Sequence, residues 1–234
     1  MSPSPALSAI EQRRLRVHAA VRELLSEQGF KVSMEAVAAR AGCSKQTLYA
    51  QFGNKQGLLR SLIEEHLDLA TTPLARDVED PRGTLLAFAT QHLEHLCDPS
   101  VMATNRLLTA EAHHFPQEAQ SLYHDGCDTL QQRLADWIGN AMRKGRLRHD
   151  EPHFAAEMLL GMIAGLDLER QRFGVAHRAS DEARQRWARF AVDAFLRAFS
   201  PDAKHRADDG RTDPPTVVRL RAPGGRTTPK NSKT

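Results

Sequence analysis

The sequence has no run of about 18 apolar residues, which a membrane-spanning helix would need. Its N-terminus, MSPSPALSAIEQRRLR, has no apolar signal region, so we expect a cytoplasmic protein. Its three cysteines, Cys43, Cys97 and Cys127, are spaced too widely for a metal motif or a disulfide framework. We therefore expect neither a membrane partner nor a bound metal.

Local motifs of enzymes are also missing. The sequence contains no G-x-S-x-G elbow, no phosphate-binding glycine loop and no convincing local pair of nucleophile and base. We therefore expect no enzymatic activity and no cofactor.

The net charge of +3 is small, but it is unevenly distributed. Residues 1–70 carry 9 basic and 7 acidic side chains (+2), residues 71–200 carry 15 and 18 (−3), and residues 201–234 carry 8 and 4 (+4). Basic ends and an acidic middle are compatible with nucleic-acid contact, although this signal is weak alone.

The sequence predicts an all-α chain with no strands and no internal repeat. Capping residues and helix breakers delimit the expected helices: 8–29, 33–42, 44–53, 54–70, 85–96, 99–115, 116–144, 152–173 and 181–199. We predict a small helical domain over 8–70, a larger helical domain over 71–200 and a disordered basic tail over 201–234. The tail is rich in Pro, Gly, Asp, Arg, Lys and Thr.

Residues 33–52, SMEAVAARAGCSKQTLYAQF, contain two short helical patterns separated by Gly42 and Cys43. Isolated helices of this length are marginal in water, so each must borrow stability from its neighbours. Two short helices joined by a tight turn containing glycine are typical of a helix-turn-helix. Its packed side is expected to contain Val37, Ala38, Ala41, Leu48 and Phe52.

The exposed side of the second short helix, residues 44–52, predicts contact with double-stranded DNA. Lys45 can donate to guanine, Gln46 can pair with adenine, and the Thr47 methyl group can meet thymine. Lys55, just after the helix-capping Asn54, is expected to lie along the phosphate backbone. The predicted DNA-binding residues are Ser33, Ser44, Lys45, Gln46, Thr47, Tyr49 and Lys55.

Residues 10–65 resemble the N-terminal domain of the TetR/AcrR family of transcriptional regulators. The matching residues are Ala36-Val37-Ala38, Ala41-Gly42-Cys43-Ser44, Thr47-Leu48-Tyr49, Phe52, Lys55 and Leu58-Leu59, after a helix ending in Gly29-Phe30. The resemblance implies a homodimer that binds a palindromic operator, usually as a repressor released by a small ligand. Cys43, Ala50, Gln51 and Gln56 depart from the usual residues, and Ala50 removes one plausible phosphate contact.

The body has a looser resemblance to the C-terminal domains of AefR-like members. It rests on Asn105-Arg106-Leu107, Ala110-Glu111-Ala112, Phe115-Pro116-Gln117, Tyr123 and Gly126. This resemblance implies helix boundaries and a ligand-binding and dimerisation domain, but it does not identify the ligand.

A broad apolar stripe on the last helix predicts a dimer interface, because large and small residues alternate along it. In this family the two terminal amphipathic helices usually form a four-helix interface with their symmetry mates. The predicted interface residues are Phe154, Met158, Met162, Trp187, Phe190, Ala194, Phe195 and Ala198. An ordinary internal core remains the alternative for each of them.

The pocket for a small-molecule effector is harder to predict. Polar or bulky residues on the middle helices are the candidates, although core or surface roles suit each of them as well. They are His92, Met102, Arg106, His113, Phe115, Tyr123, Trp137 and Met158. Arg106 could instead be structural, tied to Glu111 or another acid.

Three other hypotheses remain open. The pairs His92/His95 and His149/His153 could bind a metal effector, and Cys43 could act as a redox switch beside the second short helix. The chain could also be a dimeric interaction module whose DNA-binding function has decayed. We favour a ligand-responsive one-component transcriptional regulator, expected to be a repressor, in which ligand entry shifts the helix at 54–70.

Overall fold

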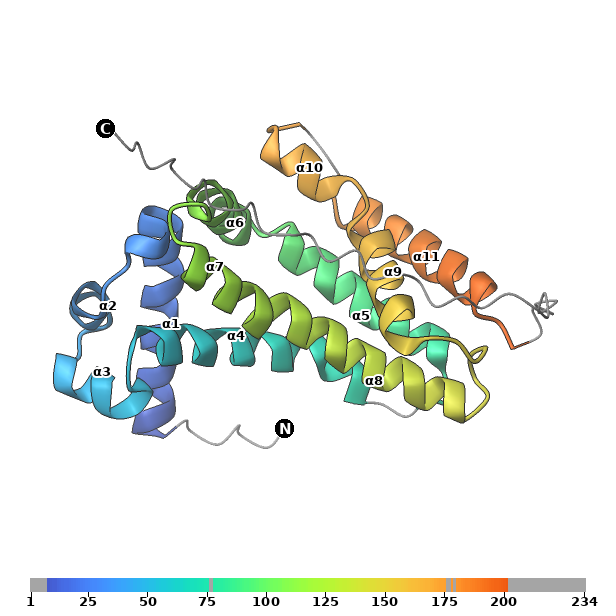
Figure 1. Ribbon diagram of the computed structural model, residues 1–234, viewed down its shortest axis with the longest axis horizontal. Coiled ribbons are helices and arrows are strands. Elements are labelled where there is room, and N and C mark those ends of the chain that lie inside the picture. The colour runs from blue at the N-terminus through green and yellow to red at the C-terminus, as the bar shows by residue number, and fades with distance from the viewer. Residues whose placement is uncertain (1–7, 76–77, 176–177, 179, 202–234) are drawn as a thin grey trace, which may run out of the picture. The chain divides into compact units, whose positions relative to one another are not determined.

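The computed structural model describes residues 8–75, 78–175, 178 and 180–201, and every regular element in these ranges is helical. The predicted all-α fold is confirmed, whereas the predicted tail lies outside the described residues from 202 onward. The elements are α1 Ala9–Gln28, η1 Gly29–Lys31, α2 Met34–Ala41, α3 Lys45–Phe52, α4 Lys55–Thr71, η2 Thr72–Ala75, α5 Pro81–Leu96, α6 Pro99–Glu111, α7 Pro116–Tyr123, the π-helical η3 His124–Asp128, α8 Thr129–Arg143, α9 Pro152–Ala164, α10 Asp167–Arg172 and α11 Asp181–Ala198 (Figure 1). Within the described ranges, no helix combines the length and low polarity needed to cross a bilayer.

Side-chain caps define where the N-terminal helices begin. The Ser8 hydroxyl accepts from the Glu11 amide, while the Glu11 carboxylate accepts from the Ser8 amide, which completes the predicted capping box. Ser33, Ser44 and Asn54 cap α2, α3 and α4 in the same way, each accepting from the amide three residues later.

The first four helices share one apolar core, which we call the head. Val17 and Leu24 of α1, Val37 of α2, Leu48 of α3 and Leu58 of α4 are almost fully buried in it. The predicted packing of α2 against α3 is therefore found, because Val37 and Leu48 belong to the same cluster. Each short helix is held by contacts that it could not make alone.

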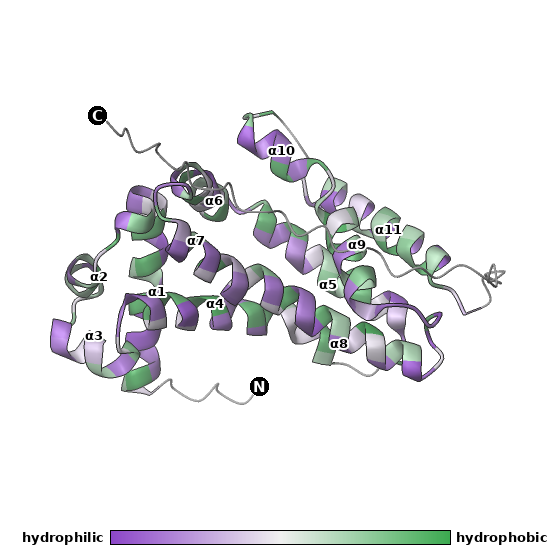
Figure 2. Cartoon of the chain, viewed as in Figure 1, coloured by the Kyte–Doolittle hydropathy of each residue, from purple (hydrophilic) through white to green (hydrophobic). Residues whose placement is uncertain are grey.

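A second, larger core lies among α5, α8, α9 and α11, which we call the body. Phe88, Leu134, Leu159 and Phe195 are among its fully buried side chains. Apolar and polar residues alternate along these helices, as amphipathic helices with one buried face require (Figure 2).

The helix predicted over 152–173 is wrong, because it is broken after Ala164. Gly165 has a φ of +54°, and a Cβ there would stand 3.0 Å from the Trp187 ring. The Trp187 indole N–H donates to the Ile163 carbonyl oxygen over 2.8 Å, which satisfies a carbonyl at the helix end. Two helices, α9 and α10, therefore replace the single predicted one.

Two other predicted helix boundaries are also corrected. The helix predicted at 85–96 begins at Pro81, because the Asp80 carboxylate caps it by accepting from the Gly83 amide over 2.8 Å. The run predicted at 116–144 is helical, but it contains the π-helical segment η3. Asp125 in this segment pairs with Arg60 of α4, with 3.2 Å between Oδ1 and Nε.

The head and the body meet at the turn η1. The Phe30 amide donates to the Glu111 carboxylate over 3.0 Å, and the Phe30 carbonyl accepts from the Lys55 ammonium. The Phe30 ring lies 5.7 Å from that of Phe115, centroid to centroid. A Cβ on Gly29 would clash with the Glu111 carboxylate oxygen and stand 2.9 Å from Leu107 Cγ, and the φ of +56° also favours glycine here.

Three histidines occupy the joint between α4 and α5. The rings of His66 and His95 stack with centroids 3.5 Å apart, and His92 stacks on Phe88. Burial lowers the pKa of all three, to about 4 for His92 and about 3 for His95. The joint is therefore packed with neutral imidazoles at neutral pH.

Replacing Gly29 with alanine is expected to lower the free energy of unfolding by roughly 2–4 kcal/mol. The new Cβ would displace Glu111 and Leu107, and it would also occupy a backbone conformation with φ +56° and ψ −133°. Chemical denaturation measures the loss. Gly42→Ala is the control, because Gly42 also has a positive φ but has nothing within 4 Å. Equal losses in the two variants would contradict the proposed clash.

Lowering the pH from 6.5 to 5 is expected to destabilise the chain by roughly 1 kcal/mol per pH unit for each of His92 and His95. The folded-state pKa of His95 lies below the unfolded value, so the unfolded chain binds more protons in this range. Stability is therefore full above pH 6.5 and is lost as the pH falls. Urea denaturation at several pH values measures this slope. The variant His95→Asn should show a shallower dependence of stability on pH, whereas His153→Asn, at an exposed position, should not. Equal pH slopes for the two variants would refute the prediction.

Candidate nucleic-acid interface

The third helix of the head, α3, presents the polar surface that the sequence predicts. Gly42 ends α2 in a left-handed conformation with φ +66°, and Ser44 then begins α3. Ser44, Lys45, Gln46 and Tyr49 are exposed and Thr47 is half-buried, while Leu48 faces the core. Hydrogen-bonding side chains therefore crowd the N-terminal turns of α3, the part of a recognition helix that meets base edges.

Lys45 is held in an ion pair across the turn. Its ammonium contacts the carboxylate of Glu35, which lies in the first turn of α2. The pair lowers the pKa of Glu35 and raises that of Lys45, so both groups remain charged near neutral pH. The first basic residue of α3 therefore has a protein partner when no DNA is present.

The two hydroxyl groups at the start of α3 also contact each other. The Ser44 oxygen accepts from the Thr47 amide over 3.1 Å and lies 2.8 Å from the Thr47 hydroxyl oxygen. Because this contact occupies the Thr47 hydroxyl, its methyl group is the part left for an apolar contact. The Gln46 side chain makes no hydrogen bond within the described ranges, so its side-chain amide is available to a ligand.

Ser33 and Lys55 are less accessible than the other predicted DNA-binding residues. The Ser33 hydroxyl is half-buried and caps α2 by accepting from the Ala36 amide over 3.2 Å. The Lys55 ammonium donates to the Phe30 carbonyl, and burial lowers its pKa. Lys55 therefore holds the start of α4 against η1, and a phosphate contact would have to compete with this hydrogen bond.

A buried polar cluster that the sequence did not reveal joins α1 to α4. His18 is fully buried, with Nδ1 against the Glu65 carboxylate and Nε2 3.1 Å from the Ser61 hydroxyl oxygen. Burial lowers the pKa of His18, against the opposing effect of Glu65. The cluster ties α4 to α1, so we expect these two helices to move together.

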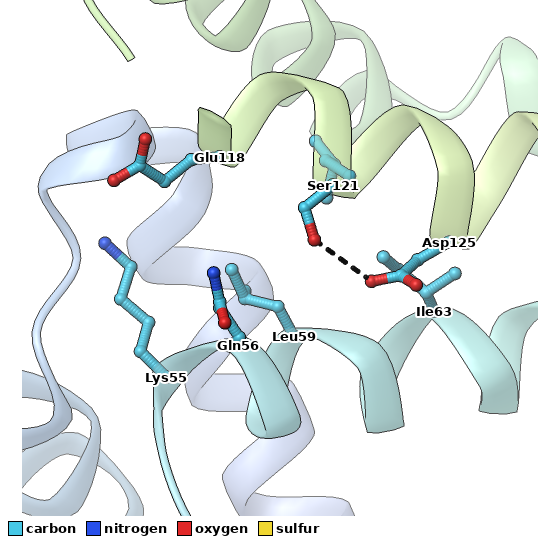
Figure 3. Close-up of a pocket in the computed structure, with 8 residues that line it drawn as sticks. Lys55, Gln56, Leu59, Ile63, Glu118, Ser121 and Asp125 are labelled. Atoms are coloured by element: carbon cyan, nitrogen blue, oxygen red, sulfur yellow. Dashed lines mark hydrogen bonds between the residues drawn. The ribbon is translucent and has the colours of Figure 1, made fainter. Parts of the chain in front are cut away.

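A small pocket of about 100 Å³ lies between the N-terminal half of α4 and the α7–η3 segment (Figure 3). Lys55 and Gln56 point into it from α4, and Glu118 and Ser121 from α7. Ser121 donates to Asp125 over 3.5 Å, at the weak limit of a hydrogen bond. None of the eight predicted ligand-binding residues lines this pocket.

The predicted ligand-binding residues do not converge on one site. His92 and Trp137 are buried in the body, whereas His113, Tyr123 and Met158 are exposed. The other three have different surroundings: Phe115 packs on Phe30, Met102 is half-buried on α6, and Arg106 is held by α10.

Arg106 has the structural role that was considered for it, but with a different partner. Its guanidinium donates to the Gln171 carbonyl oxygen over 2.9 Å and does not pair with Glu111. Glu111 is instead committed to Phe30 and Lys31. Among the described residues, no group of three or more histidines, cysteines or carboxylates is arranged to hold a metal ion.

Most residues of the predicted dimer interface lie on the outer surface of α9 and α11. Phe154 is 68% exposed, Met158 47% and Phe190 61%. Ala198 is also exposed, while Met162, Trp187 and Ala194 are half-buried. The assignment of Phe195 to the dimer interface is corrected, because Phe195 is fully buried in the body of its own chain and stacks on Phe199.

Sequence reasoning missed three of these contact groups. Glu35, Glu111 and the His18 cluster are functional candidates only because helices far apart in sequence bring their partners together. For Glu35 a signal existed: an acid in the first turn of α2 and a base that opens α3 have opposite charges and lie on either side of one short turn. Nothing in the local sequence pointed to the contact of Glu111 with Phe30 or to that of His18 with Glu65.

These features define a helix-turn-helix DNA-binding protein. It has two short helices around a glycine turn, an exposed polar surface on the second of them, and a helical body joined through α4. The chain belongs to the TetR family of bacterial transcriptional regulators. Residues 18–62 match the family model of bacterial regulatory proteins of the tetR family, and residues 83–201 match the AefR-like transcriptional repressor C-terminal domain. The resemblances found in the sequence are thereby confirmed.

Relatives of similar length support this assignment. The HTH-type transcriptional regulator YvkB of Bacillus subtilis (strain 168) is 22% identical over 193 residues, covering 80% of this chain and 97% of YvkB. The structure of FrrA, named a flavonoid-responsive regulator, is 30% identical with a TM-score of 0.63, covering 82% of this chain and all of that one. A TetR-family regulator from Mesorhizobium loti MAFF303099 is 24% identical with a TM-score of 0.65, covering 82% and 99%.

Proposed function

We propose that the chain is a one-component repressor that binds a palindromic operator as a homodimer and releases it when a small molecule binds the body. The observation that carries this proposal is the polar surface at the N-terminus of α3. Lys45, Gln46 and the Thr47 methyl group offer the contacts needed for guanine, adenine and thymine. These side chains lie on α3, a helix of 8 residues, and the major groove of DNA can admit such a helix.

The exposed apolar side chains of α9 and α11 support the dimer. Phe154, Met158 and Phe190 would leave a large apolar surface in water if the chain were a monomer. A two-fold axis through this surface would present two α3 helices to half-sites about one helical turn apart. Such a dimer would read a sequence with the same two-fold symmetry, which is a palindrome.

An effector in the body is supported by two buried polar atoms without hydrogen-bond partners among the described residues. They are Nδ1 of His92 and the indole nitrogen of Trp137, both on the list of predicted ligand-binding residues. A buried polar group without a partner is unfavourable, so a ligand oxygen that accepts from Trp137 would gain a hydrogen bond. FrrA is named for its response to flavonoids, which supports an apolar molecule that carries oxygen atoms.

Release would pass from the body to the head through α4 and α6. Glu111 of α6 and Phe115, which directly precedes α7, contact η1, and Lys55 of α4 does so from the other side. A ligand that favours a different position of these helices would change the separation of the two α3 helices in the dimer. It must bind the released state more tightly, or the equilibrium does not shift.

Fluorescence anisotropy against duplexes tiled across the upstream region of the chain's own gene tests the proposal. We expect one duplex to bind tightly and Lys45→Ala to weaken it by roughly 1–3 kcal/mol, because one base contact is lost. The same complex provides the assay for an effector, whose addition lowers the anisotropy.

The exposed variant Lys144→Ala on the body is the matched control and should bind as the wild type does. Equal, weak binding to every duplex would contradict sequence-specific recognition. Absence of binding even at low salt would instead favour the interaction module.

Replacing Phe190 with glutamate is expected to convert the dimer into monomers and to weaken operator binding at least tenfold, because a charge would enter the apolar interface. Sedimentation velocity measures the mass, and anisotropy measures the affinity. Leu69→Glu is the control, since Leu69 is 58% exposed but lies on α4. A Phe190→Glu variant that remains dimeric would place the interface elsewhere.

A further inference from the structure

We propose that Glu35 is a specificity-determining residue that acts through Lys45: it holds the Lys45 ammonium so that this group engages base edges in preference to phosphates. The inference rests on the proposed function and deepens it, because it concerns how α3 distinguishes an operator from other DNA. Glu35 belongs to α2 and is not among the residues that the sequence assigned to DNA binding.

The geometry of the turn brings the two side chains together. Glu35 lies in the first turn of α2 and Lys45 opens α3, and across the turn that contains the left-handed Gly42 their side chains form an ion pair. Both side chains are 54% exposed, so the ion pair lies at the surface that would face DNA. Within the described ranges, no second carboxylate pairs with Lys45.

A lysine ammonium has three N–H donors, and Glu35 need occupy only one of them. The remaining donors can reach the O6 and N7 acceptors of a guanine, which are neutral, while the ion pair persists. A phosphate oxygen carries a negative charge and would approach the Glu35 carboxylate as it approached Lys45. Repulsion between these anions penalises the phosphate contact but not the guanine contact.

The size of this effect is limited by the exposure of the pair. Surface ion pairs are weak because water and salt screen them, so Lys45 can leave Glu35 where DNA demands it. Glu35 would therefore reduce non-specific binding moderately without preventing it. Specificity is the ratio of the affinities for operator and for other DNA. A residue that weakens only the binding to other DNA therefore raises this ratio.

The experiment compares wild type with Glu35→Gln on two duplexes of equal length: the upstream fragment that wild type binds and a shuffled version of it. We expect the affinity for the shuffled duplex to rise about fivefold at low salt. The plot of log affinity against log salt for that duplex should steepen by about one unit, because one more phosphate is neutralised. Operator affinity should change less, so the specificity ratio falls.

Glu27→Gln is the matched control. Glu27 is another exposed head carboxylate in an ion pair, but its partner is Arg40, with 3.0 Å between the charged groups. Its loss changes the net charge of the head by the same amount as Glu35→Gln. If the two variants alter the ratio equally, overall charge explains the effect and the positioning role of Glu35 is overturned.

Repeating Glu35→Gln in a Lys45→Ala background separates positioning from direct repulsion. If Glu35 acts through Lys45, it should no longer alter the ratio or the salt slope in this background. An effect that persists would mean that Glu35 acts by itself, and no effect in either background would also overturn the inference.

Failure of the proposed function has a different signature. It would appear as equal binding of wild type to all duplexes, and the salt slope on the shuffled duplex would still test the coupling of Glu35 to Lys45. A wild type that binds neither duplex would overturn both proposals.

Discussion

The hydrogen bond from the Phe30 amide to the Glu111 carboxylate is the contact on which the placement of the DNA-binding helices depends. The same residue is held from the other side, because its carbonyl accepts from Lys55. A peptide unit fixed at both its N–H and its C=O groups cannot rotate without losing one of them. Gly29 makes this possible, since any side chain there would keep α6 away from η1.

This contact matters because the head has an apolar core of its own. The His18 cluster joins α1 to α4, and Leu58 completes the apolar core, so the head moves as one piece with the start of α4. A change in the body can reach α3 through the contacts that α1 and α4 make with α6, α5, η3 and α8. They include the Phe30–Glu111 hydrogen bond, the His66–His95 stack and the ion pairs of Arg60 with Asp125 and of Arg133 with Asp68.

Local patterns in the sequence predicted the head well and the body less well. Serine caps, Gly42 and the spacing of Val37 and Leu48 act within about twenty residues, so they are visible in the chain itself. The break at Gly165 depends on Trp187, which lies in another helix, and the burial of Phe195 depends on which side of α11 meets α5. The predicted ligand-binding residues failed to converge for the same reason: composition indicates polarity, whereas convergence requires the crossing of helices.

The π-helical segment between α7 and α8 has a consequence for how changes of length would act on the molecule. A residue added to or removed from a helix rotates everything beyond it by about 100°. Deleting one residue within His124–Asp128 could restore a regular helix, but it would turn the Asp125 side of the segment away from Arg60. The extra residue therefore sets the rotation of α8 relative to the segment before it. Trp137 of α8 is buried in the body, while Asp125, about three turns earlier, pairs with Arg60 of α4.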